Sequence, residues 1–266
     1  MPVWTDHNPV GQKPAAAISR VGRLTALLLS AALCLSPVAA LGEEPIGPMV
    51  MSNFRHSRFP TPDVPACERV EDAYFSGAVL IGDSVAEGLG IHNLIPELEV
   101  VTVIGLSPRT AATDVIFTHE RQPVTLVDKL VAMQPSMVYL WLGSNGVDTK
   151  DAARVIDDYD RLLNVLLSAM PDTLFYLLEL SPVKRIAQEK YINYTNERVN
   201  EFNAMLREVA QRHNVYLMPI NFLLKNEKGL LDGEYGAGDG IHLRKAGYWV
   251  ISEYLYTHTV PMENEG

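Results

Sequence analysis

The sequence predicts an α/β fold: a three-layer α/β/α sandwich with a five-stranded, mostly parallel central sheet. From residue 78 onward, short apolar runs alternate with segments of helical periodicity, which is typical of a parallel sheet covered on both faces. About 225 residues remain once an N-terminal export segment is set aside, which is enough for one α/β domain with a large core. Right-handed crossovers then place the helices on the two faces of the sheet.

Each expected element follows from its own pattern. Five apolar runs are the expected strands, and in chain order they cover residues 78–81, 99–103, 137–142, 173–178 and 215–218. Two segments repeat apolar residues at helical spacing, so we expect helices that face the core rather than a cofactor. Their stripes are Val155, Ile156, Tyr159, Leu162, Leu163, Leu166 and Met170 in the first, and Val199, Phe202, Leu206 and Val209 in the second. A last helix is expected to open within 243–248.

Residues 1–40 are typical of an export signal. Arg20 and Arg23 precede an apolar run at 24–35, and the small residues of 36–40 favour cleavage near Ala40. A retained anchor is the alternative, because the apolar character continues to about Leu41 and the polar segment before Arg20 is long for a signal. We therefore expect a secreted or extracytoplasmic protein, attached to a membrane only if this segment stays uncleaved.

Residues 41–72 are the expected Pro-rich linker. Its prolines stand among polar residues without a sustained period, at Pro45, Pro48, Pro60, Pro62 and Pro65. The alternative is a strap that lies on the surface of the domain. The domain itself is expected at 73–260, followed by a short C-terminal tail at 261–266.

Charge and composition exclude several classes of partner and cofactor. The net charge is −10 without a basic tract, which argues against nucleic acid or an anionic membrane surface as the main partner. No cluster of Cys, His and carboxylate residues has metal-ligand spacing, so we expect neither a metal nor a cofactor. After cleavage of the signal Cys67 would be the only thiol, so the fold must rest on packing and not on a disulfide.

Two short motifs point to nucleophilic catalysis. An apolar strand ends in Gly82-Asp83-Ser84, and a glycine-bearing loop carries Asp239-Gly240-Ile241-His242. Serine needs a base within hydrogen-bond reach, and the base works best when an acid orients it. Ser84, His242 and Asp239 could fill these roles. Taken singly, Asp83 could instead be a helix cap, and Asp239 with His242 an ordinary loop pair.

These motifs, together with Gly143-Ser144-Asn145, resemble the first, third and fifth sequence blocks of the SGNH (GDSL-type) hydrolase family. The similarity runs from about Tyr74 to Tyr254. It implies a flavodoxin-like SGNH hydrolase domain and a serine hydrolase that acts on carboxylic esters. Ser84 and Asn145 both follow predicted strands at the same edge of the sheet, where ligands bind in such folds.

The oxyanion hole departs from the family pattern. A backbone N–H at the start of a helix is free to donate, so Ser84 is one expected donor, and the resemblance makes the Asn145 amide a second. The family usually has an acid directly after this asparagine, but here an acid comes only at Asp148. In the loop at 105–110 Pro108 occupies the place of a glycine donor, and proline has no N–H. Either Gly105 or Ser107 substitutes, or the hole has two donors.

Arg109 and Asp83 are the candidate substrate contacts. Arg109 could bind an anionic or sugar substrate, although an exposed arginine is usually a solvated charge, and Asp83 is a weaker candidate. We expect an exported serine esterase that removes short acyl groups, such as acetyl, from a small-molecule, carbohydrate or cell-envelope glycan ester. The alternatives are a lysophospholipase or thioesterase, an O-acyltransferase with the same triad, and a non-catalytic glycan-binding relative.

Overall fold

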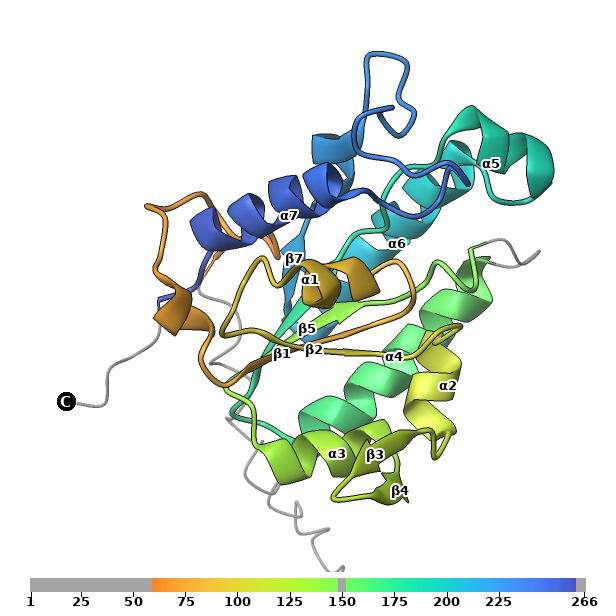
Figure 1. The fold of residues 1–266 in the computed structure, drawn as a ribbon. Coiled ribbons are helices and arrows are strands. Elements are labelled where there is room, and N and C mark those ends of the chain that lie inside the picture. The colour runs from red at the N-terminus through yellow and green to blue at the C-terminus, as the bar shows by residue number, and fades with distance from the viewer. Residues whose placement is uncertain (1–58, 148–151, 262–266) are drawn as a thin grey trace, which may run out of the picture. The chain divides into compact units, whose positions relative to one another are not determined.

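Five parallel strands form the central sheet, in the order β2-β1-β5-β6-β7 (Figure 1). The structure is a computed structural model, and it describes residues 59–147 and 152–261. The predicted fold class is confirmed, and every expected strand is present within one residue of its expected ends. The strands are β1 (Ala78–Gly82), β2 (Glu99–Thr102), β5 (Met137–Trp141), β6 (Leu174–Leu178) and β7 (Tyr216–Met218).

The two faces of the sheet bury different side chains, because successive residues of a strand point to opposite sides. Val79 and Ile81 of β1 contribute to one core, whereas Ala78 and Leu80 contribute to the other. The first core is closed by α2 (Pro108–Thr113), α3 (Leu126–Met133), α4 (Ala152–Ala169) and α6 (Asn196–His213). The second is closed by α1 (Glu87–His92), α7 (Lys245–Thr257) and the 3-10 helix η3 (Asn221–Leu224). Figure 1 shows α3 and α4 on one side of the strands and α1 and α7 on the other.

Smaller elements complete the domain. A 3-10 helix, η2 (Asp72–Phe75), leads into β1, and α5 (Arg185–Lys190) follows β6. Strands β3 (Phe117–His119) and β4 (Gln122–Val124) form an antiparallel hairpin that the sequence analysis did not predict. Within the described residues, no helix has both the length and the apolar character that crossing a bilayer requires.

Residues 59–72 lie on the domain, and we call them the strap. The Leu217 N–H donates to the carbonyl of Pro62 at 2.7 Å, so the strap extends the sheet beside the edge strand β7. Val64 is buried, with 2% of its surface exposed. Residues 59–72 of the expected linker therefore lie on the surface of the domain as a strap, which is the alternative given above. Residues 1–58, which include the expected signal and the rest of the linker, lie outside the described residues, as do Asp148 and residues 262–266 of the expected tail.

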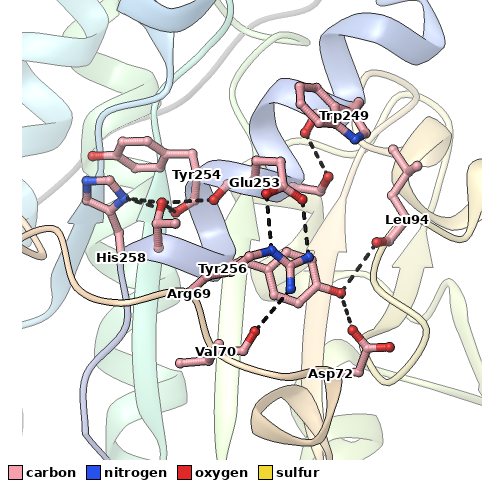
Figure 2. A network of polar contacts seen from close by, with 11 residues as sticks. Arg69, Val70, Asp72, Leu94, Trp249, Glu253, Tyr254, Tyr256 and His258 are labelled. Atoms are coloured by element: carbon pink, nitrogen blue, oxygen red, sulfur yellow. Dashed lines mark hydrogen bonds and ion pairs between the residues drawn. The ribbon is translucent and has the colours of Figure 1, made fainter.

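Side chains fasten the strap to α7 (Figure 2). The Arg69 guanidinium donates to both carboxylate oxygens of Glu253, at 3.1 and 3.2 Å, and lies 3.8 Å from the centre of the Tyr256 ring. The Tyr256 hydroxyl in turn donates to Asp72 at 2.7 Å. A bidentate ion pair combined with ring stacking is a contact that arginine makes well and lysine does not.

Candidate active site

Ser84 lies in a tight turn between β1 and α1. The helix that was expected to open at this serine begins three residues later, at Glu87. The carbonyl of Asp83 accepts from the Ala86 N–H at 3.1 Å, and its carboxylate accepts from the Val85 N–H at 2.8 Å. A side chain at position 82 would place its Cβ 2.2 Å from the Cβ of Ala86, so the close approach of this turn requires Gly82. No described residue accepts a hydrogen bond from the Ser84 N–H.

His242 and Asp239 reach Ser84 from the loop before α7. The Nε2 atom of His242 lies 3.0 Å from Ser84 Oγ, and its Nδ1 atom lies 2.7 Å from Asp239 Oδ2. The second carboxylate oxygen of Asp239 accepts from the N–H groups of Ile241 and His242, at 2.9 and 3.0 Å. Gly240 shapes this loop with a φ of 81°, a conformation that glycine adopts without strain. The structure therefore brings the three residues predicted for the triad into one chain of hydrogen bonds.

The hydrogen bonds to Asp239 hold it ionised. Partial burial alone would raise the pKa of this carboxyl, but the N–H groups of Ile241 and His242 and the imidazole outweigh it, so its pKa lies below the ordinary value of 3.8. An ionised acceptor at Nδ1 favours the tautomer that carries its hydrogen there. The lone pair of Nε2 then faces the hydroxyl of Ser84, which is the arrangement that a general base requires.

Asp83 is not placed to bind substrate, which corrects that part of the sequence interpretation. Only 1% of its surface is exposed. Its carboxylate accepts from the hydroxyl of Ser144 and from the Asn145 amide at 3.0 Å, as well as from Val85. Burial raises the pKa of Asp83 even though these donors act in the opposite direction. Asp83 thus joins the turn of the serine to the loop after β5.

Asn145 lies in that loop with both amide hydrogens engaged. Its Nδ2 atom donates to Asp83 at 3.0 Å and to the carbonyl of Leu106 at 3.2 Å. A side-chain amide has two N–H donors. Donation to an oxyanion would therefore require Asn145 to release one of these acceptors, and its role in the hole stays a prediction.

The loop between β2 and α2 holds the two positions considered for a third oxyanion donor, Gly105 and Ser107. Ser107 caps α2, and its N–H donates to the hydroxyl of Thr110 at 3.0 Å. The Leu106 N–H donates to the carbonyl of Val103 at 3.0 Å. Pro108 occupies the first position of α2, where its missing N–H costs nothing. Of the two substitutes considered for the third donor, Gly105 alone keeps an N–H that bonds to no described residue.

Arg109 lies on the exposed surface of α2, and it lines a cavity of about 420 Å³ between α2 and α4. The other lining residues are Ala112, Thr113, Asp158, Arg161, Asn164 and Val165. Ser84, Asp239, His242 and Asn145 do not line this cavity, and no described hydrogen bond or ion pair joins the Arg109 side chain to them. Across residues 59–147 and 152–261, no group of three or more His, Cys, Asp or Glu side chains could hold a metal ion.

Two residues that the sequence analysis did not single out support the site. The Tyr248 hydroxyl donates to the carbonyl of Val85, next to the serine, at 2.8 Å. The Lys184 N–H donates to the carbonyl of Gly240 at 2.9 Å, and its ammonium donates to the carbonyl of Gly236 at 2.6 Å. A backbone acceptor has no sequence signature, so only the fold reveals these contacts.

Fold and site together define a serine hydrolase of the α/β class that acts on ester bonds. The model of the GDSL-like Lipase/Acylhydrolase family matches residues 80–250, and the chain belongs to this family. The resemblance found in the sequence is thereby confirmed. No curated protein sequence matches the chain.

Solved structures share the fold at low sequence identity. A Streptococcus pneumonia protein, assigned as a platelet activating factor, has 20% identity over 68% of this chain and 82% of its own, with a TM-score of 0.53. An assigned acylhydrolase from Bacteroides fragilis has 15% identity over 72% and 88%, with a TM-score of 0.54. A GDSL-like lipase from Bacteroides thetaiotaomicron has 14% identity over 67% and 84%, with a TM-score of 0.53.

Proposed function

We propose that the protein is an exported serine esterase that hydrolyses carboxylic esters through an acyl-enzyme. Ser84 is the nucleophile, His242 the general base and Asp239 the acid that orients it. The observation that carries the proposal is the chain of hydrogen bonds from Ser84 Oγ through the imidazole to Asp239, with distances of 3.0 and 2.7 Å.

The reaction proceeds in two half-reactions. Ser84 Oγ attacks the carbonyl carbon while its proton passes to Nε2 of His242. The imidazolium, stabilised by Asp239, then protonates the leaving alkoxide as the C–O bond breaks, and the acyl group remains on the serine. In the second half, His242 takes a proton from water, the resulting hydroxide attacks the acyl carbon, and Ser84 recovers its proton as the carboxylic acid leaves.

The oxyanion is stabilised by hydrogen-bond donors beside Ser84. The Ser84 N–H is the first donor, because no described residue uses it. The Asn145 amide is the second donor: it releases the carbonyl of Leu106, at 3.2 Å, and keeps its bond to Asp83, at 3.0 Å. The Gly105 N–H is the third candidate donor, since Pro108 has none.

A short acyl group on a bulky polar alcohol is the substrate class that we favour. The side chains of His242 and Asp239 are 41% and 44% exposed, so the site is an open rim that a carbohydrate chain or cell-envelope glycan could approach. The net charge of −10 is compatible with a neutral glycan and unfavourable for an anionic lipid surface. Acetyl is the simplest acyl group for such a site.

Exposed apolar side chains favour a second candidate, a lipid ester hydrolase such as a lysophospholipase or thioesterase. Ile186 of α5 is 51% exposed and lies against Gly240 in the acid–histidine loop, and Ile192 is 88% exposed. A series of p-nitrophenyl esters from acetyl to dodecanoyl separates the two. We expect kcat/KM to be highest for acetyl, and a steady rise with chain length would support the lipid substrate instead. Transfer of the acyl group to added glycan acceptors, in competition with water, would identify an O-acyltransferase.

A fluorophosphonate probe tests the nucleophile. We expect the wild type to be labelled on Ser84, as mass spectrometry of the adduct would show, and Ser84→Ala to remain unlabelled. Ser168→Ala is the matched control, because this serine lies on α4 and its hydroxyl bonds only within that helix, to the carbonyl of Asn164. Labelling that persists in Ser84→Ala would refute the assignment.

Export is tested separately from catalysis. The expected mature N-terminus lies close to residue 41, and N-terminal sequencing of the protein from culture medium and from membranes would locate it. A membrane-bound protein that retains residues 1–40 would favour the anchored alternative.

A further inference from the structure

Helix α7 joins the loop of Asp239 and His242 to the part of the fold that holds Ser84. It begins at Lys245, three residues after His242, and packs against α1, which follows the turn of Ser84. Tyr248 lies in the first turn of α7 and points toward the segment that holds Ser84. Its hydroxyl donates to the carbonyl of Val85 at 2.8 Å. Only 4% of the surface of Tyr248 is exposed, so water does not compete for this bond.

Helix α1 leaves space for the ring of Tyr248 at Gly88. A Cβ at position 88 would lie 2.1 Å from a ring carbon of Tyr248, so the ring occupies space that only Gly88 leaves open. Burial raises the pKa of Tyr248 to about 12, and the phenol therefore remains a neutral donor throughout the range in which an esterase works. Ring and hydroxyl together fix where α1 and its preceding turn lie relative to α7.

The turn of the serine is held from two directions. Asp83 holds it from the sheet side, by accepting from the N–H groups of Val85 and Ala86. Tyr248 holds it from α7, by donating to the Val85 carbonyl. Without the tyrosine hydroxyl this buried carbonyl would lose its side-chain donor, and the turn would lose its hydrogen bond to α7.

We infer that Tyr248 is a positioning residue for ester hydrolysis: its hydroxyl sets the separation and alignment of Ser84 Oγ and His242 Nε2, by tying the serine turn to the helix that follows the histidine. The inference rests on the proposed roles of Ser84 and His242. A reacting pair is sensitive to small displacements, because proton transfer and nucleophilic attack require near-ideal distances. Tyr248 itself touches no reacting atom.

The test is Tyr248→Phe, with Tyr256→Phe as the matched control. Tyr256 lies on the same helix and is also buried, but its hydroxyl donates to Asp72, the last residue of the strap. We expect Tyr248→Phe to lower kcat for p-nitrophenyl acetate and the rate of fluorophosphonate labelling by about tenfold, with KM changed less than about twofold. Both variants should lower the unfolding temperature by a similar amount, but Tyr256→Phe should leave kcat at the wild-type level.

A second variant displaces the hydroxyl without removing it. Gly88→Ala forces the ring of Tyr248 away, and we expect the same loss of kcat and of labelling rate in the fraction that is folded. Wild-type kcat and labelling in folded Tyr248→Phe would overturn the inference, as would equal losses in Tyr248→Phe and Tyr256→Phe. If Ser84→Ala is inactive in the same assay, the proposed function stands whatever the outcome for Tyr248.

Discussion

Ser84 Oγ lies 3.0 Å from Nε2 of His242, although 158 positions separate the two residues in the chain. The topology explains their meeting. Strand β1 lies between β2 and β5 and ends just before the serine, and α7 packs beside α1 on the same face. The acid–histidine loop enters α7, so it reaches the same edge. Any change that separates α7 from α1 should therefore impair catalysis.

The Asn145 amide should be needed for turnover more than for folding. We expect Asn145→Ala to lower kcat about 10²-fold with little change in KM, because an oxyanion donor acts on the transition state. Steady-state kinetics with p-nitrophenyl acetate measure this effect, and Asn200→Ala, on the exposed face of α6, is the control. A loss of less than about fivefold would mean that Asn145 only ties Asp83 to the carbonyl of Leu106.

We expect Gly105 to contribute to the oxyanion hole through the direction of its backbone N–H. Its φ is 79°, and a Cβ there would meet no atom within 4 Å, so Gly105→Ala introduces strain without a clash. Gly229 matches it closely, with a φ of 72° and the same open surroundings, in a turn outside the candidate site. We expect both alanine variants to lose about 1 kcal/mol of stability, measured by denaturant unfolding. Only Gly105→Ala should also lower kcat, and equal activity in the two variants would remove Gly105 from the oxyanion hole.

Two carboxylates of the site should give opposite pH dependences of stability. The pKa of Asp239 is lowered by folding, so its contribution is present above the ordinary value of 3.8 and is lost as the pH falls through the folded-state pKa. The pKa of Asp83 is raised, chiefly by burial, so the folded state is favoured below 3.8 and loses that advantage as the pH rises through the folded-state value.

Urea unfolding as a function of pH would separate these contributions. Relative to wild type, Asp239→Asn should lose less stability on acidification below about pH 4, and Asp83→Asn should lose less as the pH rises from about 4. Asp239→Asn should also lower kcat by about 10⁴-fold, since an amide favours the wrong imidazole tautomer. The same pH dependence in Asp83→Asn and wild type would show that Asp83 does not titrate as its burial implies.

The sequence predicts the elements that burial determines, and it misses those that depend on a few local contacts. Strands β1 and β5 are buried along their whole length, so their apolar runs mark them clearly. Strands β3 and β4 have three residues each, and the turn between them places Glu120 and Arg121 at φ values of 47° and 69°. Neither residue is a turn signal of the kind that Asn-Gly provides, which is why the hairpin was not predicted.

The same distinction holds for the site. Ser84, Asp239 and His242 belong to motifs whose residue types indicate a chemical role, and the structure brings them together. The contact of Tyr248 with the Val85 carbonyl depends on how α7 packs, and no residue pattern encodes it. For Asp83, the position next to the serine was visible in the sequence, but its burial was not.

The strap should be part of the folded domain in solution. Val64 is 2% exposed, and its backbone neighbours bond to the sheet edge, so Val64→Ala should lower the free energy of unfolding by about 2 kcal/mol. Val115 is 57% exposed, and the same substitution there should change it by less than about 0.5 kcal/mol. Denaturant unfolding of the two variants makes the comparison. Equal stabilities would mean that residues 59–72 are a detached linker, whereas a selective loss in Val64→Ala, with kcat unchanged below the transition, would place the start of the domain at or before Val64.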